Sequence, residues 1–418
     1  MQSEFDIAIV GGGASGLMAA LAANEESLRS GAGLKIAILE KNPRVGKKLL
    51  TTGNGRCNLT NRNAGPDRYH GEVQAAFAIL KAYPPEKILQ KFRALGLLCR
   101  ELDEGRFYPY SLQAGSVLNI LRRGLEHFQI QVLCDFSVES IRKNGRGFLI
   151  SDGENLVTAR RVIVATGGRA CPQSGSSGDG YAFLKPFGHS VTALRPALVQ
   201  LRTDPVRVRP LQGVRCEAEA SLLADGKTVA ASRGEVQFAQ GALSGICMFE
   251  LSRFVDASTE KKSEISLDLA PEFSRGELVG FFAGQAQTIP SCPAIQILEG
   301  MLHKSLASEV GKAAGIPASE AASSLRKESW DRMAEAVKDF RFPVSGTLSW
   351  QNAQVTAGGI PLSETDEYLQ SRKCGGLYLC GEILNLDGDC GGYNLHWAWA
   401  SGLTAGEAAA QSLAPSSK

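Results

Sequence analysis

The chain has 418 residues, of which 44% are hydrophobic and 21% are charged. These are ordinary values for a globular protein with sizeable cores, and the length favours two or three domains. The net charge of +2 excludes a strong overall attraction to nucleic acid or anionic lipid, so neither is expected as a partner. No apolar stretch reaches the roughly 18 residues that a membrane-spanning helix needs.

The cysteine and histidine pattern gives no sign of a metal site. The ten cysteines form no C-x-x-C pair, and the five histidines do not stand near cysteines at zinc-binding spacing. The N-terminus enters a strand-like run almost at once, which leaves no room for a signal peptide. We therefore expect reduced thiols, no bound metal and a cytoplasmic location.

The first element of the chain is a short apolar run at residues 5–10, which predicts a buried parallel strand. Gly11, Gly13 and Gly16 follow in the dinucleotide-binding pattern G-x-G-x-x-G, and helix-forming sequence comes next. Gly11 permits the turn, Gly13 lets a pyrophosphate approach the backbone, and Gly16 lets the helix lie close to the strand. The alternative is a plain strand-to-helix turn without a ligand.

A second strand is predicted over residues 35–40 and ends in Glu40, where a ribose hydroxyl would need an acceptor. A polar, glycine-rich loop follows over residues 51–61. Its backbone amides are suited to wrap a phosphate or the edge of a flavin, although a surface loop is the alternative. The candidate cofactor contacts in this loop are Thr52, Gly53, Asn54, Arg56, Cys57 and Asn58.

The next part of the chain alternates helical and strand-like patterns and ends in a third buried strand. That strand, at residues 161–164, runs into Ala165, Thr166 and Gly167, whose small size lets a flat ligand approach the backbone. In order, we predict helices within 71–100, an extended segment at 106–109, a helix over 116–128, strands at 130–133 and 136–138, and a hairpin of 148–150 with 156–158.

From about residue 191 the pattern changes to alternating segments, which predict antiparallel strands, and then to short helices. An insert of this kind commonly forms the other wall of a substrate cleft. After it, an extended stretch over 346–356, a last strand, a glycine loop and a final helix from Leu395 return to the first pattern. The predicted domains are a nucleotide-binding domain in two parts, 1–190 and 346–418, a β-rich insert at 191–273 and a helical insert at 274–345.

The C-terminal order of strand, glycine loop and helix predicts a second helix N-terminus, which lies near the first if both strands belong to one sheet. Two such termini can bind one long ligand, and FAD is suitable because its reduced form carries negative charge around N1 and the C2 carbonyl. Gly391 and Gly392 lie in the loop before the final helix, and Glu382 and Asp387 are candidate acceptors for ribityl hydroxyls. The alternative for both acids is a solvated position in a loop.

Five segments together resemble the BaiN/RdsA-type family of bacterial flavoproteins, which includes bile-acid dehydro-reductases and aminoacetone oxidase. The resemblance covers essentially the whole chain. It implies an α/β fold with a Rossmann-like FAD-binding domain of the glutathione-reductase type, interrupted by a β-barrel-like domain and a small helical domain. It also implies bound FAD and a reaction with NAD(P)H. The segments are 11–16, 52–58, 165–168, 355–360 and 387–400.

The same resemblance implies a set of FAD contacts when it is carried over position by position. Two kinds of position depart from the family: His396 stands where Gln is more usual, and Thr52 and Asn54 stand where Ser and Gly are usual. The implied contacts are Gly13, Ala14, Ser15, Glu40, Lys41, Lys48, Arg56, Cys57, Asn58, Val138, Ala165, Gly167, Gly381, Asp387, Gly392, Asn394 and Leu395.

Three functions remain open from the sequence. The first is a flavin-dependent reductase that passes hydride from NAD(P)H through flavin N5 to an organic acceptor, such as an enone. The second is a flavin amine oxidase that releases peroxide, and the third is a non-catalytic redox sensor with Cys57 beside the flavin. Tyr393 and His396 are candidates for acid–base roles, but each also suits simple packing. RNA modification is disfavoured by the near-neutral charge, and the sequence indicates neither the substrate nor the oligomeric state.

Overall fold

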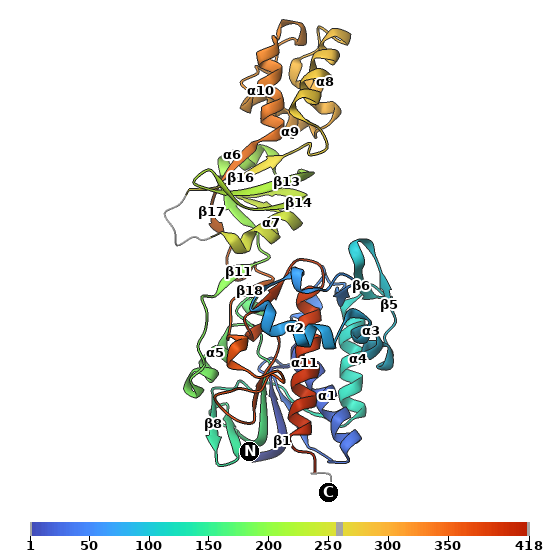
Figure 1. Cartoon of the computed structure of the whole chain (residues 1–418), viewed down its shortest axis with the longest axis vertical. Helices are drawn as coiled ribbons and strands as arrows, with labels where there is room; N and C mark the ends of the chain where they lie inside the picture. Colours follow the sequence, from blue (N-terminus) through green and yellow to red (C-terminus); the bar gives the residue numbers. More distant parts are fainter. Residues whose placement is uncertain (1, 256–261, 416–418) are drawn as a thin grey trace. The chain divides into compact units, whose positions relative to one another are not determined.

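The chain folds into two compact units, each with its own hydrophobic core (Figure 1). The computed structural model describes residues 2–255 and 262–415. The first unit contains both ends of the chain and is interrupted by the second unit, which runs from Pro196 to Ala353. The finer division of the insert into a β-rich part and a helical part stays a prediction.

The first unit is built on a mainly parallel sheet of order β7-β2-β1-β10-β9-β8, with β19 also paired to β10. Its central strands are runs of Ile, Val, Leu and Ala that are buried, as in sheets covered on both sides. This confirms the predicted Rossmann-like α/β fold. The strands are β1 (Gln2–Val10), β2 (Ile36–Leu39), β7 (Gln131–Leu133), β8 (Ser140–Asn144), β9 (Gly147–Ser151), β10 (Leu156–Val164) and β19 (Leu377–Leu379).

Two strand predictions in this sheet need correction. The strands predicted at 156–158 and 161–164 are one continuous strand, β10, which pairs with β1 along its whole length. Arg160 interrupts the apolar run in the sequence, but its side chain is exposed and forms an ion pair with Asp6. The strand predicted at 136–138 is wrong, because Asp135 has a φ of +56° that turns the chain out of the sheet direction.

Helices α1 and α11 lie side by side in the first unit (Figure 1). A Cβ added at Gly402 would meet the Ser15 carbonyl oxygen at 2.5 Å, and one added at Gly406 would meet that of Ala19 at 2.2 Å. The residue numbers increase in the same direction along both helices, so α1 and α11 run parallel to each other. The helices of this unit are α1 (Ala14–Ser30), α2 (Val73–Ala82), α3 (Pro85–Ala94), α4 (Ala114–His127), α5 (Asp179–Leu184) and α11 (Tyr393–Gln411).

Short strands complete the first unit at the edge where the glycine loops lie. One small sheet has the order β3-β6-β5, and another joins β20 to β4 in antiparallel fashion. These two sheets bring residues 60–71 next to the C-terminal glycine loop. Their strands are β3 (Thr60–Asn61), β4 (Tyr69–Gly71), β5 (Cys99–Glu101), β6 (Arg106–Pro109) and β20 (Leu386–Gly388).

The second unit contains a closed barrel of order β12-β15-β14-β13-β16-β17 and a group of helices. The barrel confirms the β-barrel-like part that the family resemblance implies. In the described ranges, no helix is both long and apolar enough to cross a lipid bilayer. The elements are β12 (Leu201–Thr203), β13 (Arg215–Ala224), β14 (Lys227–Ala239), β15 (Ala242–Ser244), β16 (Ser263–Asp268), β17 (Phe340–Thr347), α6 (Pro205–Val208), α7 (Ile246–Leu251), α8 (Arg275–Thr288), α9 (Lys304–Ala313) and α10 (Lys327–Lys338).

The strand that closes the barrel, β17, was not predicted in its correct place. The sequence predicts an extended segment over 346–356, whereas β17 ends at Thr347 and the next strand, β18 (Val355–Ala357), begins after a break. Strand β17 pairs with β12 on one side and with β16 on the other. It therefore belongs to the barrel.

Candidate functional site

The first glycine turn has the geometry that a dinucleotide site requires. Gly11 has a φ of +108°, and a Cβ there would lie 2.5 Å from the Ala165 carbonyl oxygen. A Cβ at Gly16 would lie only 1.9 Å from the Gly11 carbonyl oxygen. A Cβ at Gly13 would meet nothing within 4 Å, and no side chain caps α1 there. The N-terminus of α1 thus faces open space, which suits a pyrophosphate.

Glu40 lies beside this turn, at the end of β2. Its Oε2 accepts a hydrogen bond from the Gly12 backbone N–H at 2.7 Å, and its Oε1 accepts from the Asn42 backbone N–H at 2.8 Å. The carboxylate is therefore fixed next to the glycine loop, where the sequence analysis expects a ribose. The next residue, Lys41, forms an ion pair with Asp179 at 2.5 Å, which joins the end of β2 to the start of α5.

The loop after η1 (Leu49–Thr51) contains four left-handed residues: Gly53, Asn54, Gly55 and Cys57 have φ values of +56°, +54°, +79° and +59°. Asn is one of the few non-glycine residues that tolerate this conformation, which explains how Asn54 stands where the family more often has Gly. Burial raises the pKa of the Cys57 thiol to about 12, although a hydrogen bond with Thr52 partly opposes the shift. Cys57 is therefore a protonated, buried thiol at neutral pH.

The first and last glycine motifs meet in space although they lie at opposite ends of the chain. Gly381 has a φ of +81°, and a Cβ there would lie 2.4 Å from the Ser15 hydroxyl oxygen. The Gly381 backbone N–H donates to the Ser401 hydroxyl at 2.9 Å. Gly381 therefore lets the end of β19 approach α1 and α11 together.

An ion pair and a backbone bond fix Glu382. The Lys48 ammonium lies 2.7 Å from Glu382 Oε2, and the Thr356 backbone N–H donates to Oε1 at 3.0 Å. Thr356, which the sequence analysis did not select, accepts hydrogen bonds from two successive backbone N–H groups, those of Arg169 and Ala170. Its hydroxyl thus fixes the chain that follows β10.

A buried polar atom of Asn58 lies beside the start of α11 and has no hydrogen-bond partner in the described part of the chain. Gly392, the residue before the helix, has a φ of +101°, and a Cβ there would lie 2.6 Å from Asn58 Oδ1. Asn58 is 7% exposed, and its Oδ1 has no hydrogen-bond partner among the described residues. A buried acceptor without a donor is costly. A ligand that carries N–H or O–H donors, such as the imide and ribityl groups of FAD, would satisfy it.

The two helix starts are spaced for a long ligand. Gly402 of α11 lies against Ser15 of α1. Gly402 comes ten residues after Gly392, whereas Ser15 comes only two residues after Gly13, so α11 begins eight residues earlier than α1 relative to this contact. At about 1.5 Å per residue, the start of α11 lies about 12 Å beyond the start of α1 along their common direction. One terminus can take phosphate groups while the other faces a distant, electron-accepting part of the same molecule. The chain therefore fits FAD.

The C-terminal glycine loop is held by hydrogen bonds from Asn394 within it and from Asn61 outside it. Asn394 accepts a hydrogen bond from the Gly388 backbone N–H and donates to the Gly388 carbonyl oxygen, both at 2.8 Å. The Gly391 carbonyl oxygen accepts from Asn61 at 2.9 Å. Asp387 is 3% exposed and lies on β20 opposite His70, so it is not a solvated loop acid.

Other predicted contacts lie at the margins of this region. Arg56 is exposed and its guanidinium lies 5.1 Å from the centre of the Tyr108 ring. Val138 and Leu395 are half-buried and pack against the core of the first unit. All predicted cofactor contacts fall within the first unit, and their roles stay predictions.

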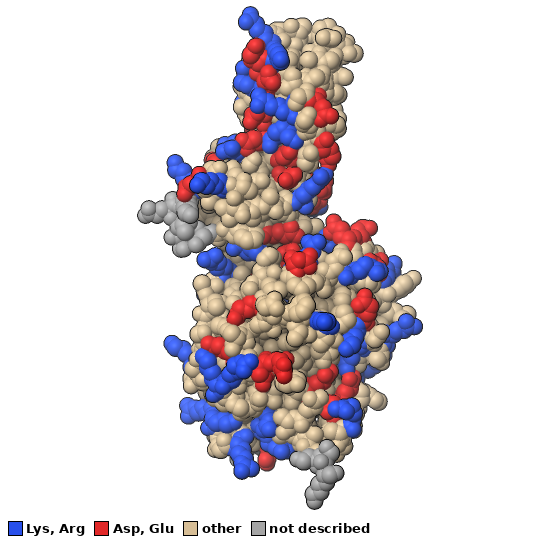
Figure 2. Space-filling view, viewed as in Figure 1, with Lys and Arg blue, Asp and Glu red and all other residues tan. Residues whose placement is uncertain are grey.

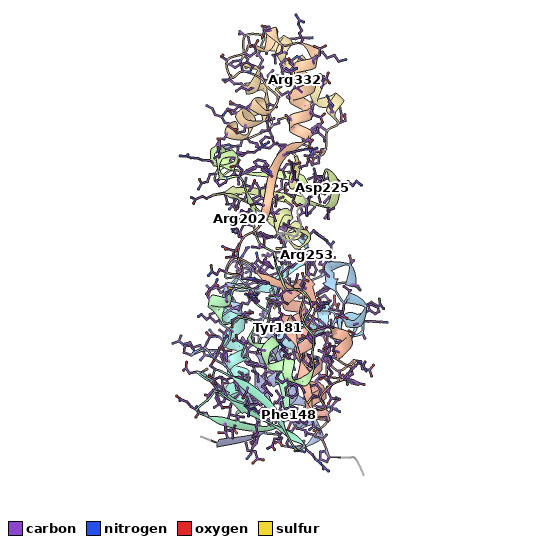
Figure 3. All side chains as sticks on the ribbon, turned by 90° about the vertical axis from the view of Figure 1, so that its left-hand side faces the viewer. Phe148, Tyr181, Arg202, Asp225, Arg253 and Arg332 are labelled. Atoms are coloured by element: carbon purple, nitrogen blue, oxygen red, sulfur yellow. The ribbon has the colours of Figure 1, made fainter. Side chains whose placement is uncertain are left out.

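Two buried hydroxyl groups of the first unit have no hydrogen-bond partner in the part of the chain that the structure describes. They belong to Thr166, which the sequence analysis selected, and Tyr181 on α5, which it did not. Figure 3 shows Tyr181 inside the first unit. Burial raises the pKa of Tyr181, and the charge of Glu382 raises it further. No sequence pattern distinguishes Tyr181 from an ordinary core tyrosine.

His396 is fully buried near the start of α11, and its candidate acid–base role stays a prediction. Its Nδ1 lies 2.8 Å from the Thr60 hydroxyl oxygen, and Nε2 makes no hydrogen bond to any described residue. Burial lowers the pKa of His396 to about 4, so the ring is neutral at physiological pH. Among the described residues, no group of three or more His, Cys, Asp and Glu side chains could hold a metal ion.

The comparisons with known proteins agree with this geometry. A family model described as "HI0933-like protein Rossmann domain" matches residues 5–408. The 3-dehydro-bile acid delta(4,6)-reductase of Clostridium scindens is 37% identical over 97% of this chain and 99% of its own length. The ribosomal RNA dihydrouridine synthase of Escherichia coli is 26% identical over 95% of this chain and 96% of its own length.

Solved structures resemble the chain in fold. The 3-ketosteroid delta1-dehydrogenase of Sterolibacterium denitrificans has a TM-score of 0.53 with 14% identity, covering 98% of this chain and 100% of that one. A flavocytochrome c3 fumarate reductase has a TM-score of 0.51 with 15% identity, covering 99% of this chain and 79% of that one.

Proposed function

Since the chain belongs to the HI0933-like Rossmann family, of the BaiN/RdsA type, and is an FAD-dependent oxidoreductase, we propose that it reduces a carbon–carbon double bond conjugated to a carbonyl group in a steroid-type small molecule. NAD(P)H is the proposed hydride donor. When bound, FAD would supply the hydride-transfer chemistry, and the residues of the protein would bind, orient and stabilise the reacting groups.

The observation that carries this proposal is the likeness to the 3-dehydro-bile acid delta(4,6)-reductase, which extends over nearly the whole of both chains. The Escherichia coli relative, which is named for dihydrouridine synthesis, supports the same type of chemistry. Dihydrouridine differs from uridine by reduction of a double bond conjugated to a carbonyl group. The reactions for which the bile-acid reductase and the dihydrouridine synthase are named therefore both concern an electron-poor double bond.

The residues of the site have distinct proposed roles towards FAD. The backbone at Gly13 would bind the pyrophosphate, and Glu40 would accept from the adenosine ribose. Asn58 and the N-terminus of α11 would hold the end of the cofactor that becomes negatively charged on reduction. A helix N-terminus stabilises such charge, which favours acceptance of the hydride.

The alternatives have less support. The sensor hypothesis requires a reactive thiol, but Cys57 is buried and its pKa is raised to about 12, which disfavours the thiolate. No feature of the site favours an amine substrate. On the face shown in Figure 2, basic and acidic side chains are interspersed over both units, as the small net charge predicts. Because the Escherichia coli relative is named for an RNA substrate, the absence of a nucleic-acid partner stays a prediction.

The proposal is tested by an anaerobic titration of the purified protein. Flavin absorbance at about 450 nm is followed while NADH or NADPH is added, and a 3-oxo-4,6-diene bile acid is then mixed with the reduced protein. We expect one nucleotide to bleach the band and the dienone to restore it. Reduction by dithionite serves as the control for flavin reactivity.

Each result separates one step of the proposal. A flavin that dithionite reduces but neither nucleotide reduces would exclude NAD(P)H as the donor. A reduced flavin that oxygen reoxidises but the dienone does not would exclude the dienone as the acceptor. A protein without flavin, even after incubation with FAD, would contradict the cofactor site.

A further inference from the structure

Reduction of a conjugated double bond also requires a proton, and the structure offers a donor at the start of α11. We propose that Tyr393 is the acid that protonates the substrate carbon next to the carbonyl group. This inference rests on the proposed function, because it supplies the second half of the same reaction. Tyr393 is the first residue of α11 and follows Gly391 and Gly392 directly.

The position of the Tyr393 side chain is fixed by its surroundings. Its ring packs edge-to-face against Tyr69, with ring centres 6.2 Å apart, and the Tyr69 hydroxyl donates to the Tyr393 carbonyl oxygen at 3.1 Å. A Cβ at Gly391 would lie 3.0 Å from the Tyr393 ring, and one at Gly388 would lie 2.6 Å from Tyr393 Cβ. Glycine at these two positions makes room for the ring, so its orientation is set before a substrate binds.

The Tyr393 hydroxyl is suited to proton donation. The ring of Tyr393 is buried, and within the described ranges its hydroxyl makes no hydrogen bond. The hydroxyl oxygen is not among the fully buried polar atoms that lack a partner, so it is open to solvent. In contrast, the Tyr69 hydroxyl is committed to the backbone. The Tyr393 hydroxyl is therefore free to donate to a substrate atom that displaces water from it.

Charged groups of both signs surround Tyr393. Burial raises the pKa of Tyr393, which keeps the hydroxyl protonated at neutral pH, whereas the positive charges of Arg68 and Arg106 oppose the shift. Asp389 and Asp67 add negative charge and act in the other direction. Tyr393 is thus a phenol in the resting protein, and the two arginines stabilise the phenolate that forms when it gives up the proton.

The reaction balances with this single donor. The carbon at the far end of the double bond takes a hydride, which carries two electrons, from the reduced cofactor. The carbon beside the carbonyl takes the proton of the Tyr393 hydroxyl, and the phenolate left behind regains a proton from water. The cofactor returns to its oxidised form, and the substrate has gained two hydrogen atoms.

The test compares Tyr393→Phe with Tyr110→Phe, which changes a tyrosine that is 61% exposed. Both variants are reduced with dithionite, so no nucleotide is needed, and are mixed with the dienone in a stopped-flow instrument. We expect Tyr393→Phe to slow reoxidation by the dienone about 100-fold or more, because general acids typically contribute at least this factor. Tyr110→Phe should keep the wild-type rate.

Three further readouts isolate proton donation from damage to the site. Tyr393→Phe should keep its flavin content and thermal midpoint, its rate of reoxidation by oxygen, and, within about threefold, its affinity for the dienone in the oxidised form. If reoxidation by the dienone also stays at the wild-type rate, Tyr393 is not the acid. If oxygen reoxidation or flavin content falls equally, the role is structural and the inference fails. If the wild-type protein itself does not react with the dienone, the proposed function fails first.

Discussion

The two helix starts of the first unit are built in different ways. At the start of α1, an added Cβ at Gly13 meets nothing, and the site consists of backbone and open space. At the start of α11, an added Cβ at Gly392 meets Asn58, and Tyr393 and Tyr69 pack alongside. The first arrangement suits a phosphate in any nucleotide, whereas the second depends on particular side chains. General binding and specific chemistry are thus assigned to different ends of one ligand site.

The largest effect is expected from Gly16→Ala at the first helix start. The new Cβ would lie 1.9 Å from the Gly11 carbonyl oxygen, and a backbone atom there cannot move without opening the strand–helix junction. Overpacking of this kind costs about 1–3 kcal/mol and occasionally more. We expect a protein that unfolds at clearly lower urea concentration and purifies without flavin. A variant with wild-type stability would show that the junction is looser than the structure indicates.

A matched change, Gly13→Ala, should separate binding from folding. Its Cβ meets no protein atom within 4 Å, so the apoprotein should keep its urea midpoint. The methyl group would fill the space proposed for the pyrophosphate, and FAD affinity should fall about 100-fold, which equals about 2.7 kcal/mol. Fluorescence titration of the apoprotein with FAD measures this. Unchanged affinity would place the pyrophosphate elsewhere.

Asn58→Ala tests the second helix start and should have a smaller effect. The Asn58 Oδ1 atom is buried without a partner in the described chain, so its removal should leave the apoprotein equally stable or slightly more stable. If FAD pairs with this oxygen, affinity should fall by about 1–2 kcal/mol, the range for one buried hydrogen bond. A lower FAD affinity together with an unchanged or higher apoprotein stability would identify Asn58 as a ligand contact. A loss of apoprotein stability without a loss of affinity would contradict the assignment.

The difference between the helix starts also explains what the sequence could reveal. Gly13 and Gly16 act mainly through local backbone geometry, so the spacing of the motif predicts both the turn and its use, although Gly11 also faces the distant Ala165. Asn58 acts through contact with Gly392, which is distant in the sequence, and a single sequence does not contain that pairing. Resemblance to a family identified Asn58, but only the structure shows that its oxygen lacks a donor.

The same limit applies to the barrel. Phe340, Phe342 and Val344 alternate with exposed residues in β17, so a strand signal is present in the sequence. Pro343 and Gly346 obscure it, because both residues are typical breaks in a strand. In the structure Pro343 faces outwards between its buried neighbours and is tolerated. Whether such a segment joins the barrel depends on distant partners, which periodicity does not identify.

His396 provides the smallest and most specific test of the second helix start, where its ring contacts Thr60. Burial lowers the pKa of His396 from 6.5 to about 4 in the folded protein. Between these values the unfolded chain binds more protons than the folded chain. The contribution of His396 to the free energy of unfolding is therefore complete above the pKa of the ring in the unfolded chain. It is lost as the pH falls towards the pKa of the ring in the folded protein.

Replacement by glutamine should remove this acid sensitivity. At about pH 5.5 the wild-type protein should lose about 1 kcal/mol of stability through His396, and His396→Gln should not. Burial also lowers the pKa of His189, so the informative quantity is the difference between the two proteins in urea unfolding at each pH. His127→Gln, at an exposed position, is the control. Equal acid sensitivity in wild type and His396→Gln would mean that the ring takes up a proton without leaving its place, and the start of α11 would then be more accessible to water than its burial indicates.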